Sequence, residues 1–220
     1  MKHYIPKFFT VISLILIATG IIAQNGVVYS FTFKIDEELT EYFKVENKSK
    51  KWFPGFSVSD AMPEQLLDSI KRKTEEAFTN KFNLPVKLCY HKNKKDKEIG
   101  GVGVMGYLEG LPSNTFNSGK EDCPGNSHYI KLDVSISANG LSVVLGTKRT
   151  KLKPQINIRA KVYDENKNEV WDKVITIKDF EKLRSETVYY GNTEITKAET
   201  LTPYDIYAMY LMGMDMMIGD

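Results

Sequence analysis

The sequence predicts an α+β fold, with a largely antiparallel sheet and two helices packed on it. Three observations indicate this class. Several segments alternate apolar and polar residues with a period of two, which is typical of half-buried strands. Turn residues join the later segments into hairpins. Two other segments, at about 63–82 and about 203–217, place apolar residues at the spacing of an amphipathic helix.

The strands are predicted in chain order. Residues 27–35, "VVYSFTFKI", alternate without interruption, and residues 129–138, "YIKLDVSISA", do so again. A short strand at 86–90 follows the first helix, and Asn139-Gly140 turns the chain into a continuation at 141–145. The further strands and loops are a Gly-rich strand at 99–108, a basic loop at 146–153, a strand at 156–162, a turn at 164–169 and a strand at 170–177.

The helices have recognisable beginnings. Pro63 suits the first turn of the first helix, where a missing N–H costs little. Thr202 and Asp205 have the spacing of a capping box, with Pro203 between them at the first helical position. The predicted organisation is a signal peptide at 1–23 and a single α+β domain at 24–220, of which 24–59 is a less regular N-terminal extension.

The first 23 residues read as a secretory signal peptide. Lys2 and Lys7 precede a charge-free apolar run of about 16 residues, which is shorter than the roughly 20 residues of a membrane span. Small residues then place the cleavage after Gly20 or Ala23. We therefore expect a periplasmic or secreted protein. An uncleaved leader that acts as an anchor is the alternative, and after cleavage no stable membrane anchor is expected.

The charge balance argues against nucleic-acid binding. The chain has 30 Lys and Arg against 28 Asp and Glu, and the leader supplies two of the lysines and no acid. The mature chain is therefore formally neutral, whereas a nucleic-acid-binding protein shows a clustered excess of positive charge.

Gly101, Gly103 and Gly106 spell G-x-G-x-x-G, the pattern of a dinucleotide-binding turn. That site needs a buried strand before the glycines and a helix after them. A charged segment, "HKNKKDKE", precedes them, and Gly110 and Pro112 follow, which excludes a helix of useful length. We expect no nucleotide cofactor, and a strand whose glycines permit a bulge or the close approach of another backbone.

The mature chain has two cysteines and two histidines, in the pairs Cys89/His91 and Cys123/His128. Three interpretations remain open. The cysteines form a disulfide, which suits an exported protein; they are unrelated thiols; or all four residues hold zinc or copper, although their spacings are not the common ones.

No catalytic residues are predicted, because neither a nucleophile elbow nor an H-E-x-x-H motif occurs. Five methionines cluster in the C-terminal helix, where core packing is the ordinary role. An exposed side with Met212 and Met214 is a hypothetical docking surface. The 12 tyrosines and 11 phenylalanines would suit a carbohydrate-binding module only if some of them lay exposed in a row.

The hairpin "INIRAKVYDENKNEVWDKVITI", with a helix before it and one after it, resembles exported bacterial envelope domains of the curli-export lipoprotein family and small envelope lipoproteins of unassigned function. Asp164, Asn166, Asn168 and Trp171 occupy places comparable to the turn residues and tryptophan of that pattern. The resemblance covers residues 60–217. This chain lacks the cysteine that carries the lipid in those lipoproteins. It implies an envelope protein that works through partner contacts.

The function expected from the sequence is therefore that of an exported, non-enzymatic envelope protein that binds a partner protein or ligand. Its expected contact surfaces are the sheet around 99–108 and the C-terminal helix. The alternative is a metal-binding exported protein or a metal-dependent hydrolase that uses Cys89, His91, Cys123 and His128.

Overall fold

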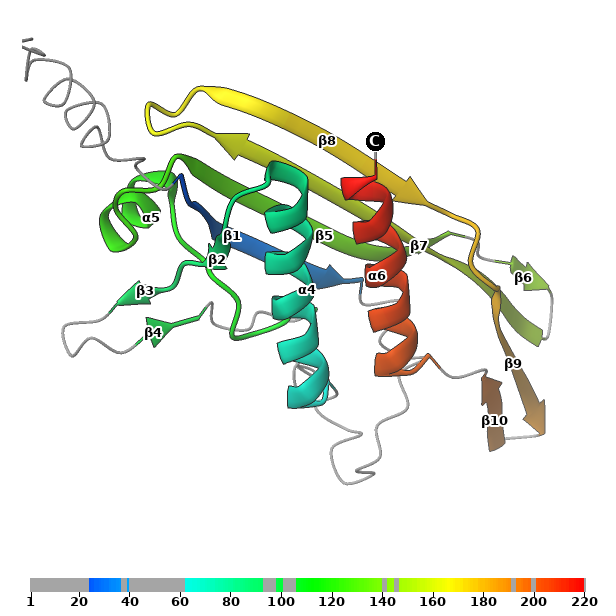
Figure 1. The fold of residues 1–220 in the computed structure, drawn as a ribbon. Coiled ribbons are helices and arrows are strands. Elements are labelled where there is room, and N and C mark those ends of the chain that lie inside the picture. The colour runs from blue at the N-terminus through cyan, green and yellow to red at the C-terminus, as the bar shows by residue number, and fades with distance from the viewer. Residues whose placement is uncertain are drawn as a thin grey trace, which may run out of the picture.

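The computed structural model describes residues 24–36, 39, 62–92, 98–100, 106–139, 142–144, 147–190, 193–198 and 201–219. The leader lies outside this part of the chain. A long twisted sheet forms one layer, and two helices lie side by side across one of its faces (Figure 1). The α+β class and the largely antiparallel sheet predicted from the sequence are confirmed.

The strand that comes first in the sequence lies inside the sheet. β1 (Gly26–Ile35) pairs in parallel with both β2 (Val86–Leu88) and β5 (His128–Asn139). Its alternation places Phe31, Phe33 and Ile35 in the main core. The strand predicted at 27–35 is therefore an internal strand of the sheet, and most of the rest of the stretch 24–59, expected to be a less regular extension, lies outside the described residues.

β2 covers only the first part of the outer edge of β1. Beyond it, residues 106–114 run along the same edge and exchange backbone hydrogen bonds with it. Phe31 N donates to Pro112 O at 2.8 Å, and Ile35 N donates to Gly106 O at 2.7 Å. Of the strand predicted at 99–108, Glu98–Ile99 form β4, which pairs with β3 (His91–Lys92), and 101–105 are not described.

The other half of the sheet is antiparallel and is built on one long strand. β7 (Thr147–Tyr163) pairs with β5 along one edge and with β8 (Glu169–Ile177) along the other. The first residues of β7 extend beyond this region and pair with β6 (Ser142–Val144) and β9 (Leu183–Tyr190), and β9 pairs with β10 (Thr193–Ala198).

The expected basic loop at 146–153 was therefore wrong, because residues 147–153 belong to β7. The sequence "TKRTKLK" has almost no apolar alternation, and only the pairing with β6 and β9 makes it a strand. Tertiary context commonly overrides β-propensity in this way.

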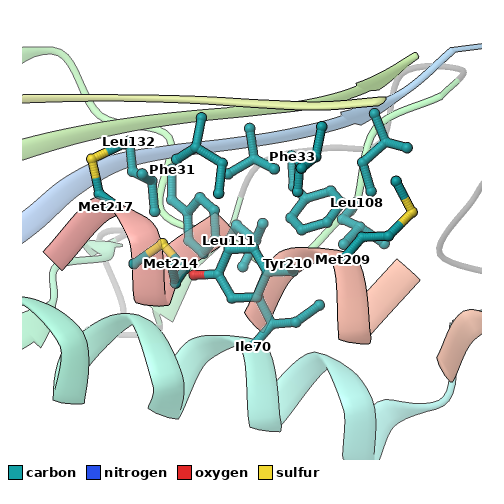
Figure 2. Close-up of a cluster of buried hydrophobic side chains, with 14 of the residues drawn as sticks. Phe31, Phe33, Ile70, Leu108, Leu111, Leu132, Met209, Tyr210, Met214 and Met217 are labelled. Atoms are coloured by element: carbon teal, nitrogen blue, oxygen red, sulfur yellow. The ribbon is translucent and has the colours of Figure 1, made fainter. Parts of the chain in front are cut away.

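The helices are the two that the sequence predicts. α4 is Glu64–Phe82, and α6 is Pro203–Ile218, which begins at the expected capping box of Thr202 and Asp205. Between these helices and the sheet lies a continuous apolar core, part of which is shown in Figure 2. Gly213 lets α6 approach β7, since a Cβ at this position would lie 2.5 Å from Cδ1 of Ile158.

A short third helix, α5 (Phe116–Asp122), covers a second, smaller apolar cluster. Its members are Val27, Tyr29, Cys89, Phe116 and Tyr129. No helix was predicted here, because seven residues that include Gly119 show no helical periodicity. Gly119 is needed where α5 meets β1, since an added Cβ would lie 2.6 Å from Cβ of Tyr29.

Candidate functional site

Cys89 and Cys123 form a disulfide, which is the first of the three arrangements that the sequence left open. The bond joins the end of β2 to the end of α5, with a Cα–Cα distance of 6.2 Å. Cys89 is fully buried in the smaller cluster. Because the two sulfur atoms are bonded to each other, neither is available as a thiolate ligand for a metal.

The two histidines have partners of their own. His91 Nδ1 lies 2.9 Å from Asp122 Oδ2, so this pair ties the same two segments together beside the disulfide. His128 Nδ1 lies 2.9 Å from Ser127 Oγ, and its ring lies 5.4 Å from that of Phe82. Within the described ranges, no group of three or more His, Cys, Asp or Glu side chains is placed to hold a metal ion.

The G-x-G-x-x-G pattern is described only at its last glycine, Gly106. Of its glycines, Gly101 and Gly103 lie outside the described residues. Gly106 has φ of 85°, and a Cβ there would lie 2.7 Å from the carbonyl oxygen of Ile35. Gly100 likewise lies against the backbone of Gly110, since a Cβ added at Gly100 would lie 2.6 Å from the Cα of Gly110. The predicted role of glycine in close backbone approach is confirmed at these two positions.

The sheet face opposite α4 and α6 carries paired charges. Arg159 Nη2 lies 2.9 Å from Asp172 Oδ2, and Lys161 forms ion pairs with both Asp172 and Glu169. The hydrogen bond from Arg159 lowers the pKa of Asp172. An acid that stays ionised at neutral pH cannot serve as a general acid, so this ladder is an ion-paired sheet surface.

A row of exposed aromatic side chains, which a carbohydrate-binding module would need, is not found in the described part of the chain. The large hydrophobic side chains that it exposes are Val170, Val174, Tyr204, Met212 and Met216. Tyr204 is the one aromatic residue among these five, so they do not form such a row.

A hollow lies beside the first half of α6, and we call it the α6 groove. Its volume is about 430 Å³, within the range of roughly 300–1,000 Å³ that is typical of ligand pockets. It lies where α6 passes the junction of β8 and β9. Its lining residues are Pro154, Phe180, Glu181, Lys182, Leu183, Leu201, Asp205, Ala208, Met209 and Met212.

The lining of the α6 groove is mainly apolar. Met212 is 50% exposed at its wall, whereas Met209 and Leu183 are buried in the core beneath it. Asp205 is committed to the helix cap, because its carboxylate accepts hydrogen bonds from the backbone N and Oγ of Thr202. Glu181 and Lys182 are the remaining charged side chains of the lining.

The hypothesis that Met212 and Met214 form an exposed docking side of the C-terminal helix is correct for one of the two residues. Met212 is exposed and lines the α6 groove, but Met214 is fully buried in the core. Residues 212 and 214 are separated by about 200° on a helix, so they cannot share a face. The second exposed methionine is Met216, at 51%, and it does not line the groove.

Sequence reasoning found the helical wall of this groove and missed the opposite wall. Phe180 and Leu183 lie in and after the segment that joins β8 to β9, and β9 was not predicted from the sequence. The available signal was the apolar pair within the charged stretch "KDFEKL" at 178–183.

No protein-family model matches this sequence, and no curated protein matches it either. Among solved structures, the chain is similar to a Helicobacter pylori protein described as a neuraminyllactose-binding hemagglutinin homolog. The TM-score is 0.38 at 8% identity, and the alignment covers 89% of this chain and 81% of that chain. A similarity this low carries no argument about function.

No helix in the described part of the chain is long and apolar enough to span a membrane.

Proposed function

We propose that this chain is an exported, non-enzymatic protein that works by binding, and that the α6 groove is its binding site. The observation that carries the proposal is a mainly apolar hollow of about 430 Å³ with an exposed methionine in its wall. Apolar side chains that remain open to solvent in a concave site gain free energy when a partner covers them.

The chemistry of the groove favours a largely apolar ligand or side-chain cluster. Met209 and Met212 supply flexible, polarisable side chains, which adapt to partners of different shape. Lys182 and Glu181 add one charge of each sign, so the groove has no strong preference for an anion or a cation. The envelope domains that the hairpin resembles also work through partner contacts.

Two features support export. The leader has the composition of a signal peptide, and the Cys89–Cys123 disulfide is a kind of bond that persists in oxidising compartments. The metal-dependent alternative has no comparable support, because both sulfur atoms of its ligand set are in the disulfide.

The proposal can be tested with an apolar fluorescent probe, 1-anilinonaphthalene-8-sulfonate, and a matched pair of variants. Met212 and Met216 lie on the same helix and are 50% and 51% exposed, but only Met212 lines the groove. We expect Met212→Glu to weaken probe binding by about tenfold, which corresponds to about 1.4 kcal/mol, because a carboxylate opposes both the apolar rings and the sulfonate of the probe, and Met216→Glu to leave it nearly unchanged. Equal effects of the two substitutions would show that the probe does not bind in the groove.

The biological partner can be sought at the same position. A photo-crosslinking benzoylphenylalanine at position 212 should capture a specific envelope component in cells. The same group at Glu76, an exposed position on α4, serves as the control. The proposed function fails if position 212 captures nothing beyond what position 76 captures.

A further inference from the structure

The two long edges of the sheet differ in the described structure. The outer edge of β1 is covered by β2 and by residues 106–114. On the other side, β8 pairs with β7 and with no other described strand. The nine residues of β8, "EVWDKVITI", contain neither proline nor glycine. Its pairing with β7 is irregular at Val170 and unbroken from Trp171 to Ile177, so these seven residues offer a regular open edge.

The charges of β8 are engaged inside the chain. An open edge is usually guarded against pairing by free charged side chains, proline or bulges. Here Asp172 pairs with Arg159 and Lys161, and Lys173 Nζ donates to the carbonyl oxygen of Gly219 at 2.6 Å. Val174, on the outer face of the strand, is 55% exposed, and Val170, at the irregular position, is 52% exposed.

We propose that β8 is a self-association surface, which pairs antiparallel with β8 of a second copy of this chain so that the two sheets become continuous. In a two-fold symmetric pairing each contact occurs twice, and the residue on the axis lies opposite itself. We place Val174 on this axis. Trp171 then lies opposite Ile177 of the second copy, and Asp172 lies opposite Thr176 of the second copy.

The sequence of β8 selects this register and this occupant. An axis at Lys173 or at Asp172 would place two like charges directly opposite each other, which is destabilising. An axis at Trp171 would pair only residues 169–173, because β8 begins at Glu169. With Val174 on the axis, seven residues (171–177) pair and no like charges meet.

The inner face of the strand supports the same pairing. Trp171 and Ile175 point toward the helix layer and are partly buried against the core, and Ile177 is buried. Aromatic and β-branched residues opposite each other stabilise a pair of strands by about 0.2–1 kcal/mol. The surface is separate from the α6 groove, so this inference stands independently of the proposed function.

Cysteine crosslinking distinguishes this register from other contacts. Directly opposite Cβ atoms in an antiparallel pair are about 4.5–5.5 Å apart, so Val174→Cys should give a covalent dimer on mild oxidation. In Val170→Cys the two cysteines would lie eight residues apart along the paired strands, about 26 Å, and should not crosslink. The two valines have nearly equal exposure, so Val170→Cys is a matched control.

The unmodified protein should sediment as a dimer at micromolar concentration. Val174→Lys, which places two lysines together on the axis, should raise the dimer dissociation constant by at least about tenfold. Circular dichroism checks that this variant folds. A protein that stays monomeric at 100 µM, or equal crosslinking at positions 170 and 174, would overturn the proposal.

Discussion

The hydroxyl oxygens of Thr74 and Tyr210 lie 2.7 Å apart in the core between α4 and α6. Thr74 Oγ1 also donates to the carbonyl oxygen of Ile70 at 2.7 Å, which uses its only proton. Tyr210 must therefore be the donor to Thr74. Burial raises the pKa of Tyr210, so the phenol keeps its proton at any physiological pH. Figure 2 shows its ring packed between the sheet and Ile70.

This direction of donation predicts unequal effects of removing the two hydroxyls. Thr74→Val leaves the buried phenol without an acceptor and should cost about 1–3 kcal/mol of unfolding free energy. Tyr210→Phe leaves the hydrogen bond from Thr74 to Ile70 in place and should cost less, about 0.5–1.5 kcal/mol. Urea unfolding of the two variants and the double variant measures both. Equal single effects that add in the double variant would argue against this donor assignment.

Gly106 and Gly125 form a natural comparison. Both have positive φ, 85° and 79°, but only Gly106 has a backbone atom where a Cβ would lie. Substitution by alanine strains φ at both positions, at a cost of about 1–2 kcal/mol. We expect Gly106→Ala to cost at least about 1 kcal/mol more, because Ile35 belongs to a central strand and cannot easily move. Thermal unfolding of both variants measures the difference, and equal losses would contradict the close approach.

His128 predicts a pH dependence of stability. Burial lowers its pKa from the ordinary value of 6.5, so the unfolded chain binds this proton more readily than the folded chain. Its contribution is complete above pH 6.5 and declines as the pH falls below that value. We expect the unfolding free energy to decrease between pH 7.5 and 5, and His128→Gln to reduce that slope. A variant with the same slope as the unmodified protein would exclude His128 as a source.

A second titration should appear at alkaline pH. Burial, with a smaller contribution from Tyr163, raises the pKa of Tyr29 to about 12. Since the pKa of this tyrosine in the unfolded chain is near 10, its contribution to stability is complete below pH 10. That contribution is lost as the pH rises toward 12. Following unfolding between pH 9 and pH 12 in the unmodified protein and in Tyr29→Phe tests this. The variant should lose less stability over that interval.

Removal of the disulfide should destabilise the fold. The bond closes a loop between residues 34 positions apart, for which the chain-entropy relation gives about 3–4 kcal/mol. The Cys89→Ala, Cys123→Ala double variant should lose that amount of unfolding free energy. His91→Ala, which removes the exposed hydrogen bond with Asp122 and keeps the disulfide, should lose less than about 1 kcal/mol. Unfolding in urea without reductant compares them, and equal losses would mean that the disulfide is not the main link.

Periodic segments were predicted well from the sequence, and context-dependent segments were not. The alternation at 27–35 and the helical spacing at 63–82 reappear as β1 and α4 within a residue or two. The basic half of β7 and the strands β9 and β10 show little alternation of apolar and polar residues. They form strands because they pair with one another. The α6 groove could not be predicted from the sequence, because one of its walls depends on β9.

The position of β1 has a consequence for the order of folding. Both of its long-range strand partners come later in the chain, and β5 begins about 100 residues after it. During synthesis, β1 therefore emerges with both edges unsatisfied and an apolar face uncovered. Non-local parallel pairing of this kind slows folding and lengthens the exposure of aggregation-prone surface. The nascent chain should accordingly depend on a holding chaperone until residue 139 has emerged.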